Sequence, residues 1–100
     1  MEDKFLPIGT VINLKGATKR IMIAGFCPEL DGKMYDYSGT LFPEGLMGPD
    51  KTLLFNHDQI EKIYHKGLVD DEEKAFINKL NDTLNKVKSG ELKTSSEENL

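Results

Sequence analysis

The sequence predicts an α+β fold, in which a small five-stranded antiparallel curled sheet or SH3-like barrel is followed by one C-terminal amphipathic helix. Two observations lead to this prediction. Five short runs of apolar and aromatic residues are separated by Gly, Pro, Asp and Asn, which favour turns. After Leu68 the apolar residues recur at helical spacing instead. Whether the strands close into a barrel is left open.

Three predicted strands occupy the first half of the chain. The first covers about residues 10–15, because alternate residues there are apolar. The second, at 20–27, is almost continuously apolar, which is typical of a strand buried on both faces. Gly25 inside it indicates a bulge or a sharp bend. The third strand covers 34–42, after a hairpin loop whose turn is the Asp-Gly pair at 31–32.

Two further strands follow a long connection. Residues 43–52 hold two prolines and two glycines, and they lead to a short fourth strand at 53–55. Asn56 or Asp58 is predicted to cap a single helical turn, because their side-chain oxygens accept hydrogen bonds from free backbone amides. The fifth strand is predicted over 60–66.

The C-terminal third has a helical pattern. An acidic run at 70–73 favours a helix N-terminus. One apolar stripe follows at helical spacing, formed by Phe76, Ile77, Leu80, Leu84 and Val87. A Ser-Gly pair then provides a stop, so that the helix covers about 70–89. We therefore predict a β-rich domain over 1–68, a helical segment over 69–90 that packs on it or projects from it, and a disordered acidic tail over 91–100.

Composition and charge narrow the class of protein. The chain has 100 residues, of which 38% are apolar, and this fits one soluble domain. Its net charge of −4 argues against nucleic-acid binding, because nucleic-acid binders present a basic face. No apolar run approaches the ~20 residues of a membrane-spanning helix. The acidic N-terminus lacks the features of a secretory signal, and Cys27 has no second cysteine with which to form a disulfide. We expect a cytoplasmic protein that binds neither nucleic acid nor membrane.

No motif indicates catalysis. His57 and His65 lack the spacing of a zinc site, and Cys27 has no base beside it in the sequence. No serine lies in a nucleophile elbow. We therefore predict that the chain is not an enzyme and that it holds no metal and no cofactor.

Apolar and aromatic residues are the candidates for binding a partner. Leu46 and Met47 lie at the tip of a turn segment, where polar residues are the norm, so they either fold back over the sheet or form a contact point. The helix stripe likewise packs on the chain's own sheet or enters a partner's groove. The predicted partner-binding residues are Tyr35, Tyr37, Leu46, Met47, Phe76, Leu80 and Leu84.

A series of short motifs resembles a known family. The motifs are Leu-Pro-Ile-Gly-Thr at 6–10, Tyr-Asp-Tyr at 35–37, Pro-Glu-Gly at 43–45 and Phe-Asn-His-Asp-Gln-Ile at 55–60, with Gly67 after them. In this order they resemble small Gram-positive proteins of unknown function that are encoded beside toxins of the type VII secretion system, including toxins with an LXG N-terminal domain. The resemblance covers about residues 5–77.

The resemblance implies a cytoplasmic accessory or chaperone-like protein, which binds a toxin or its small helical export partner and keeps it soluble. One alternative is an immunity protein that blocks a toxin domain, since an acidic surface complements a basic nuclease. Another is a nucleic-acid-binding small barrel that uses Tyr35, Tyr37 and the basic loop at 15–20, although the net charge argues against it. The partner's identity and a homodimer through the helix are left open.

Overall fold

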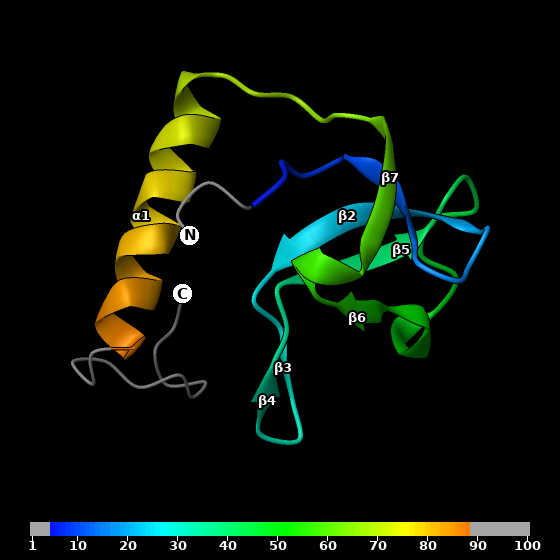
Figure 1. Ribbon diagram of the computed structural model, residues 1–100, viewed down its shortest axis with the longest axis horizontal. Coiled ribbons are helices and arrows are strands. Elements are labelled where there is room, and N and C mark those ends of the chain that lie inside the picture. The colour runs from blue at the N-terminus through cyan, green and yellow to red at the C-terminus, as the bar shows by residue number, and fades with distance from the viewer. Residues whose placement is uncertain (1–4, 89–100) are drawn as a thin grey trace. The chain divides into compact units, whose positions relative to one another are not determined.

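The β-rich part of the chain is an open five-stranded antiparallel sheet (Figure 1). The structure is a computed structural model that describes residues 5–88. The chain divides into two compact units, with the boundary between Leu68 and Val69. Within the β unit the strand order is β6-β5-β2-β1-β7, so that β6 and β7 are the edges of the sheet. The predicted α+β class is confirmed, and of the two alternatives the chain adopts the open sheet.

The strands of this sheet match the predicted segments closely. They are β1 (Val11–Leu14), β2 (Arg20–Phe26), β5 (Tyr37–Leu41), β6 (Leu53–Phe55) and β7 (Ile60–His65). The predicted third strand at 34–42 is divided, because a small ribbon of β3 (Glu29–Leu30) and β4 (Lys33–Met34) precedes β5. Cys27 has a left-handed φ of 56°, which turns the chain out of β2 and into this ribbon.

The bulge predicted at Gly25 is present. Ile23 pairs with Gly39 and Gly25 pairs with Ser38, so Ala24 is the extra residue of β2. A Cβ atom on Gly25 would lie 2.5 Å from Ser38 Oγ, and one on Gly39 would lie 2.7 Å from the Met22 carbonyl oxygen. Both glycines therefore allow the two central strands to approach each other.

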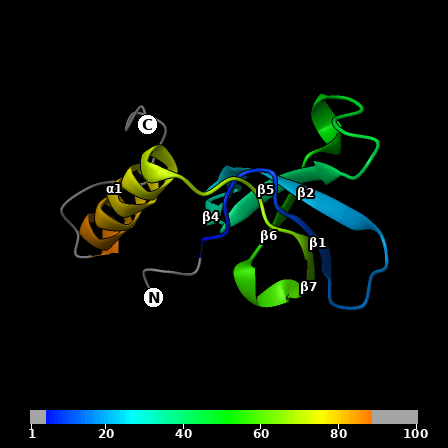
Figure 2. The same cartoon turned by 90° about the horizontal axis from the view of Figure 1, so that it is seen from above.

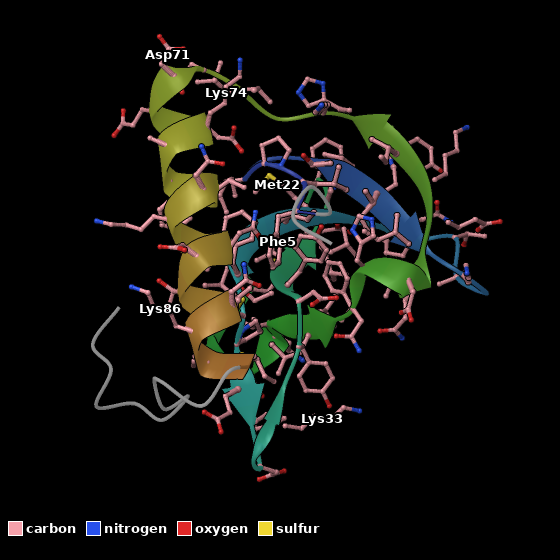
Figure 3. The ribbon with its side chains drawn as sticks, turned by 60° about the vertical axis from the view of Figure 1, so that its left-hand side comes forward. Phe5, Met22, Lys33, Asp71, Lys74 and Lys86 are labelled. Carbon is pink, nitrogen blue, oxygen red and sulfur yellow. The ribbon has the colours of Figure 1, made fainter. Side chains whose placement is uncertain are left out.

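Most of the core lies on one face of the sheet, whereas Val11, which pairs with Met22, is buried on the other face. Residues that pair directly across strands share a face, so the register places Ile12 and Ile21 beside each other. The buried apolar residues are Phe5, Val11, Ile12, Ile21, Ile23, Tyr37 and Phe55. Phe5, labelled in Figure 3, precedes the first strand and completes the core, because its ring meets Phe26 and Tyr37 edge-on at centroid distances of 5.5 and 5.9 Å. Burial of these side chains is the main stabilising contribution of the unit.

The two ends of the β unit meet at Thr10 and Gly67. Thr10 Oγ1 donates a hydrogen bond to the Pro7 carbonyl at 2.7 Å and accepts one from the Gly67 amide at 3.0 Å. A Cβ atom at position 67 would collide with the Ile8 carbonyl oxygen. The segment before β1 and the segment after β7 are therefore held together at a point where only glycine fits.

Two caps begin helical segments where the sequence predicts them. The 3-10 turn η2 (His57–Gln59) begins after Asn56, whose amide donates to Gln59 Oε1 at 2.8 Å. Asp70 caps the helix α1 (Asp71–Lys88), and its Oδ1 accepts from the Glu73 amide at 2.9 Å. The predicted stop and tail after residue 88 lie outside the described residues. Among the residues that the structure describes, no helix has both the length and the apolar character needed to cross a membrane.

Candidate protein-binding surface

The connection between β5 and β6, residues 42–52, presents apolar side chains to solvent. Where it leaves β5, the Gly45 amide donates a hydrogen bond to the Leu41 carbonyl at 2.7 Å. It ends in the 3-10 turn η1 (Pro49–Lys51), whose last amide donates to the Gly48 carbonyl at 3.0 Å. Backbone hydrogen bonds therefore hold the connection on both sides of its tip.

Lys19 and Glu44 join this connection to the β1–β2 turn. Lys19 Nζ donates to Glu44 Oε2 at 2.7 Å, and this hydrogen bond lowers the pKa of the Glu44 carboxyl. In both ribbon views the turn and the connection extend from the same end of the sheet (Figures 1 and 2). The two side chains are 45% and 43% exposed, so the pair adds little stability. The pair nevertheless records a contact between the connection and the β1–β2 turn.

Leu46 and Met47 form the tip of the connection, and we call this pair the apolar tip. Their side chains are 60% and 64% exposed, so they do not fold back over the sheet. An apolar pair on a loop that is fixed on both sides resembles the anchors of protein interfaces, since little loop entropy is lost on binding. Of the two alternatives that the sequence leaves open, folding back over the sheet is therefore wrong, and a contact point stays a prediction.

The two tyrosines of the predicted set lie apart from the apolar tip. Tyr37 is completely buried in the core, so we leave it out of the candidate surface. Tyr35 is half-buried at the base of the ribbon, with Lys33 Nζ 5.1 Å from its ring centroid. Tyr35 precedes β5 whereas the tip follows it, and five strand residues span roughly 17 Å. The structure therefore does not bring Tyr35 and the tip into one site.

The helical members of the predicted set belong to the other compact unit and are described by themselves. Phe76 is 50% exposed, whereas Leu80 and Leu84 are half-buried. Asp71 begins the helix and Lys86 lies near its end, as Figure 3 shows. The helix predicted for this segment is confirmed.

The Tyr37 hydroxyl is the centre of a polar network. It accepts a hydrogen bond from the Leu6 amide at 3.0 Å and lies 2.8 Å from His57 Nδ1. Burial raises the pKa of Tyr37 to about 12, so the phenol stays neutral at physiological pH. Which of the two groups donates in the Tyr37–His57 hydrogen bond depends on the tautomer of the His57 ring. The network ties the N-terminal segment and η2 to β5.

Asp36 extends the network through the backbone. Its amide donates to Asn56 Oδ1 at 3.1 Å, and its Oδ2 accepts from the His57 amide at 2.8 Å. The Tyr-Asp-Tyr segment and the Asn-His-Asp segment are therefore bonded to each other through side chains and backbone. These polar groups hold two distant segments in register.

One cluster of cationic and aromatic side chains is not predicted by any pattern in the sequence. Arg20, Phe42, Lys62 and Tyr64 form a cationic–aromatic cluster on the sheet, with cation-to-ring distances of 4.8 to 5.8 Å. They come from segments far apart in the chain, and no spacing rule connects them. The available signal is Tyr64, an aromatic residue close to two lysines on the predicted fifth strand.

No metal centre is found within residues 5–88, where no three His, Cys, Asp or Glu side chains lie close enough to hold an ion. The two histidines have different surroundings. His57 is hydrogen-bonded to Tyr37, whereas His65 is exposed on β7.

A comparison with protein families identifies the domain. A family model described as a domain of unknown function, DUF4176, matches residues 5–76. The chain belongs to the DUF4176 family. The matched segment contains the whole five-stranded sheet and the first turn of α1. The DUF4176 segment therefore includes the apolar tip and Phe76, whereas Leu80 and Leu84 lie beyond it. No curated protein and no solved structure matches this DUF4176 chain.

Proposed function

We propose that this DUF4176 protein is a non-catalytic, cytoplasmic protein-binding module of a type VII secretion toxin locus. It binds a toxin, or the small helical partner with which the toxin is exported, and keeps it soluble until export. The observation that carries this proposal is the apolar tip, two adjacent apolar side chains that are more than half exposed on a connection with backbone hydrogen bonds on both sides of its tip. The association with toxin genes comes from the resemblance of the sequence motifs.

The contacts of the polar network join segments of the fold. His57 Nδ1 lies 2.8 Å from the buried Tyr37 hydroxyl, and the His57 backbone amide donates to Asp36 Oδ2. The proposal of a binding role therefore rests on the exposed apolar tip and not on this network.

Binding is tested with purified domains of the neighbouring toxin. The N-terminal export domain, the C-terminal toxin domain and the small helical export protein are each titrated against the full chain by calorimetry. We expect the export domain or the helical protein to bind, and Leu46→Ser with Met47→Ser to weaken binding about tenfold, because truncating an interface anchor costs roughly 1–2 kcal/mol.

Leu30→Ser is the matched control. Leu30 is exposed to a similar extent, 53%, but lies on the β3–β4 ribbon. We expect it to bind like the unmodified chain. Binding only to the C-terminal toxin domain would replace the accessory role by an immunity role. If none of the three proteins binds, the proposed function is wrong.

A further inference from the structure

The outer face of the sheet, opposite the core, carries a row of residues that continues from strand to strand. The register pairs Arg20 of β2 with Asn13 of β1, and Asn13 with Lys62 of β7. Phe42 joins the row at the end of β5, where its amide donates to the Arg20 carbonyl at 3.0 Å. Directly paired residues point to the same face, so Arg20 and Lys62 stand on one side of the sheet with β1 between them.

Aromatic rings and cations alternate along this row. The Arg20 guanidinium carbon lies 5.1 Å from the Phe42 ring centroid and 5.8 Å from that of Tyr64. Lys62 Nζ lies 4.8 Å from the Tyr64 centroid. Because Tyr64 belongs to β7 and Arg20 to β2, their contact passes over β1, where Asn13 is buried. The rings restrict Arg20, and a guanidinium held over ring faces keeps its N–H donors at its edge.

The two cations of the cluster have no carboxylate partner within the described part of the chain. The nearby acidic side chains are bonded elsewhere: Glu44 pairs with Lys19, and Glu61 accepts from Asn13 Nδ2 at 2.9 Å. The chain nevertheless has a net charge of −4. Arg20 and Lys62 are exposed, neither forms an ion pair with a carboxylate in the described residues, and the Tyr64 ring beside them is 45% exposed. Such a pair of cations is complementary to a negatively charged group.

We propose that the cationic–aromatic cluster of Arg20, Phe42, Lys62 and Tyr64 is a docking surface for a short acidic segment of a partner protein. Arg20 binds a carboxylate through two N–H donors, Lys62 pairs with a second carboxylate, and Tyr64 provides an apolar floor between them. The inference rests on the proposed function in taking the partner to be a protein. It adds a second binding surface, on the sheet, to the apolar tip. It also requires the partner to carry negative charge at the segment that binds there.

Protein carboxylates fit this cluster better than nucleic acid. Single-stranded nucleic acid binds to open aromatic faces on which bases stack, along a groove of many cations. Here Arg20 and Lys62 already lie over the rings, and they are the two cations of the cluster. Glu61 and Glu44 at the margin of the cluster repel a polyphosphate chain more than they repel one or two carboxylates.

A peptide of defined charge tests the surface without any toxin. The probe is acetyl-Glu-Leu-Glu-Glu-Leu-Glu amide, and its matched control carries Gln in place of each Glu. Both are titrated into the isotope-labelled full chain at low salt, and backbone amide shifts are followed by NMR. We expect the acidic peptide alone to shift the amides of Arg20, Lys62 and Tyr64. Arg20→Gln is expected to weaken binding about tenfold, as for loss of one charged hydrogen-bonded contact.

Two further variants separate specific recognition from general charge attraction. Lys62→Gln removes the second cation and is expected to weaken binding less than Arg20→Gln, with the fold of both variants checked by their spectra. Lys51→Gln removes an exposed cation of η1, outside the cluster, and is expected to leave binding unchanged.

Equal weakening by Lys51→Gln, or equal binding of the Gln peptide, overturns the proposal. Tighter binding of a short oligothymidylate would assign the surface to nucleic acid instead. Shifts at the cluster without toxin binding would leave this surface standing and contradict only the proposed function.

Discussion

The Tyr37 hydroxyl lies 2.8 Å from His57 Nδ1, which joins two segments that are 20 residues apart in the chain. A second hydrogen bond joins the same segments, from the Asp36 amide to Asn56 Oδ1 at 3.1 Å. Strand β5 is thereby tied to the turn η2, which leads directly into the edge strand β7. Two motifs that seem independent in the sequence therefore act as one structural element.

Replacing Tyr37 by phenylalanine tests this element. The variant keeps the ring in the core but leaves the Leu6 amide and His57 Nδ1 without their partner. We expect the free energy of unfolding to fall by about 1–3 kcal/mol. Urea denaturation measures it, with Tyr35→Phe as the matched control, which is expected to change stability by less than about 0.5 kcal/mol. Equal stabilities of the two variants would mean that the network contributes nothing.

Alkaline pH is expected to remove the contribution of the Tyr37 phenol. Its pKa is about 12 in the folded chain, against an ordinary value of 10.0. The unfolded chain therefore loses the proton first as pH rises, so this stability is complete below pH 10 and is lost between about pH 10 and 12. Denaturation of the unmodified chain over this range should show an additional loss on the order of 2 kcal/mol relative to Tyr37→Phe. Parallel pH profiles would contradict the assignment.

Gly67→Ala is expected to destabilise the β unit. The new Cβ atom would meet the Ile8 carbonyl oxygen, which is backbone and cannot swing away. We expect a loss of about 1–3 kcal/mol in thermal or urea denaturation, as for other overpacked sites. Gly48→Ala serves as the comparison, because its nearest neighbour is 3.4 Å away and its backbone is extended. A Gly67 variant as stable as the Gly48 variant would show that the two ends of the unit separate freely.

The apolar tip is expected to contribute to binding without contributing to stability. Serine at Leu46 and Met47 removes side chains that are already mostly in water, so the free energy of unfolding should change by less than about 0.5 kcal/mol. Phe55→Ala, a completely buried residue on β6, should by contrast cost about 3–5 kcal/mol. Both values come from urea denaturation. A large loss in the tip variant would mean that the tip belongs to the fold.

Local patterns in the sequence predict the strands well but not the candidate surface. The alternation before Leu14, the glycine in β2 and the caps at Asn56 and Asp70 act over a few residues, so the chain reveals them directly. The exposure of the apolar tip depends on how the connection at 42–52 is tied down, and no local pattern records the Lys19–Glu44 pair. The sequence likewise predicts Tyr37 as a binding residue although it is buried, because an aromatic residue on a strand has the same pattern whether it faces the core or a partner.

The sequence by itself determined the order of strands and helix, the bulge at Gly25 and the acidic character of the chain. Each depends on the chemistry of neighbouring residues, and backbone preferences act over that range. The tertiary structure alone decided that the sheet stays open, that Tyr37 and His57 meet, and that Arg20 and Lys62 face outward on one side of β1. These features depend on strand register, which is set by packing between residues that are distant in the chain.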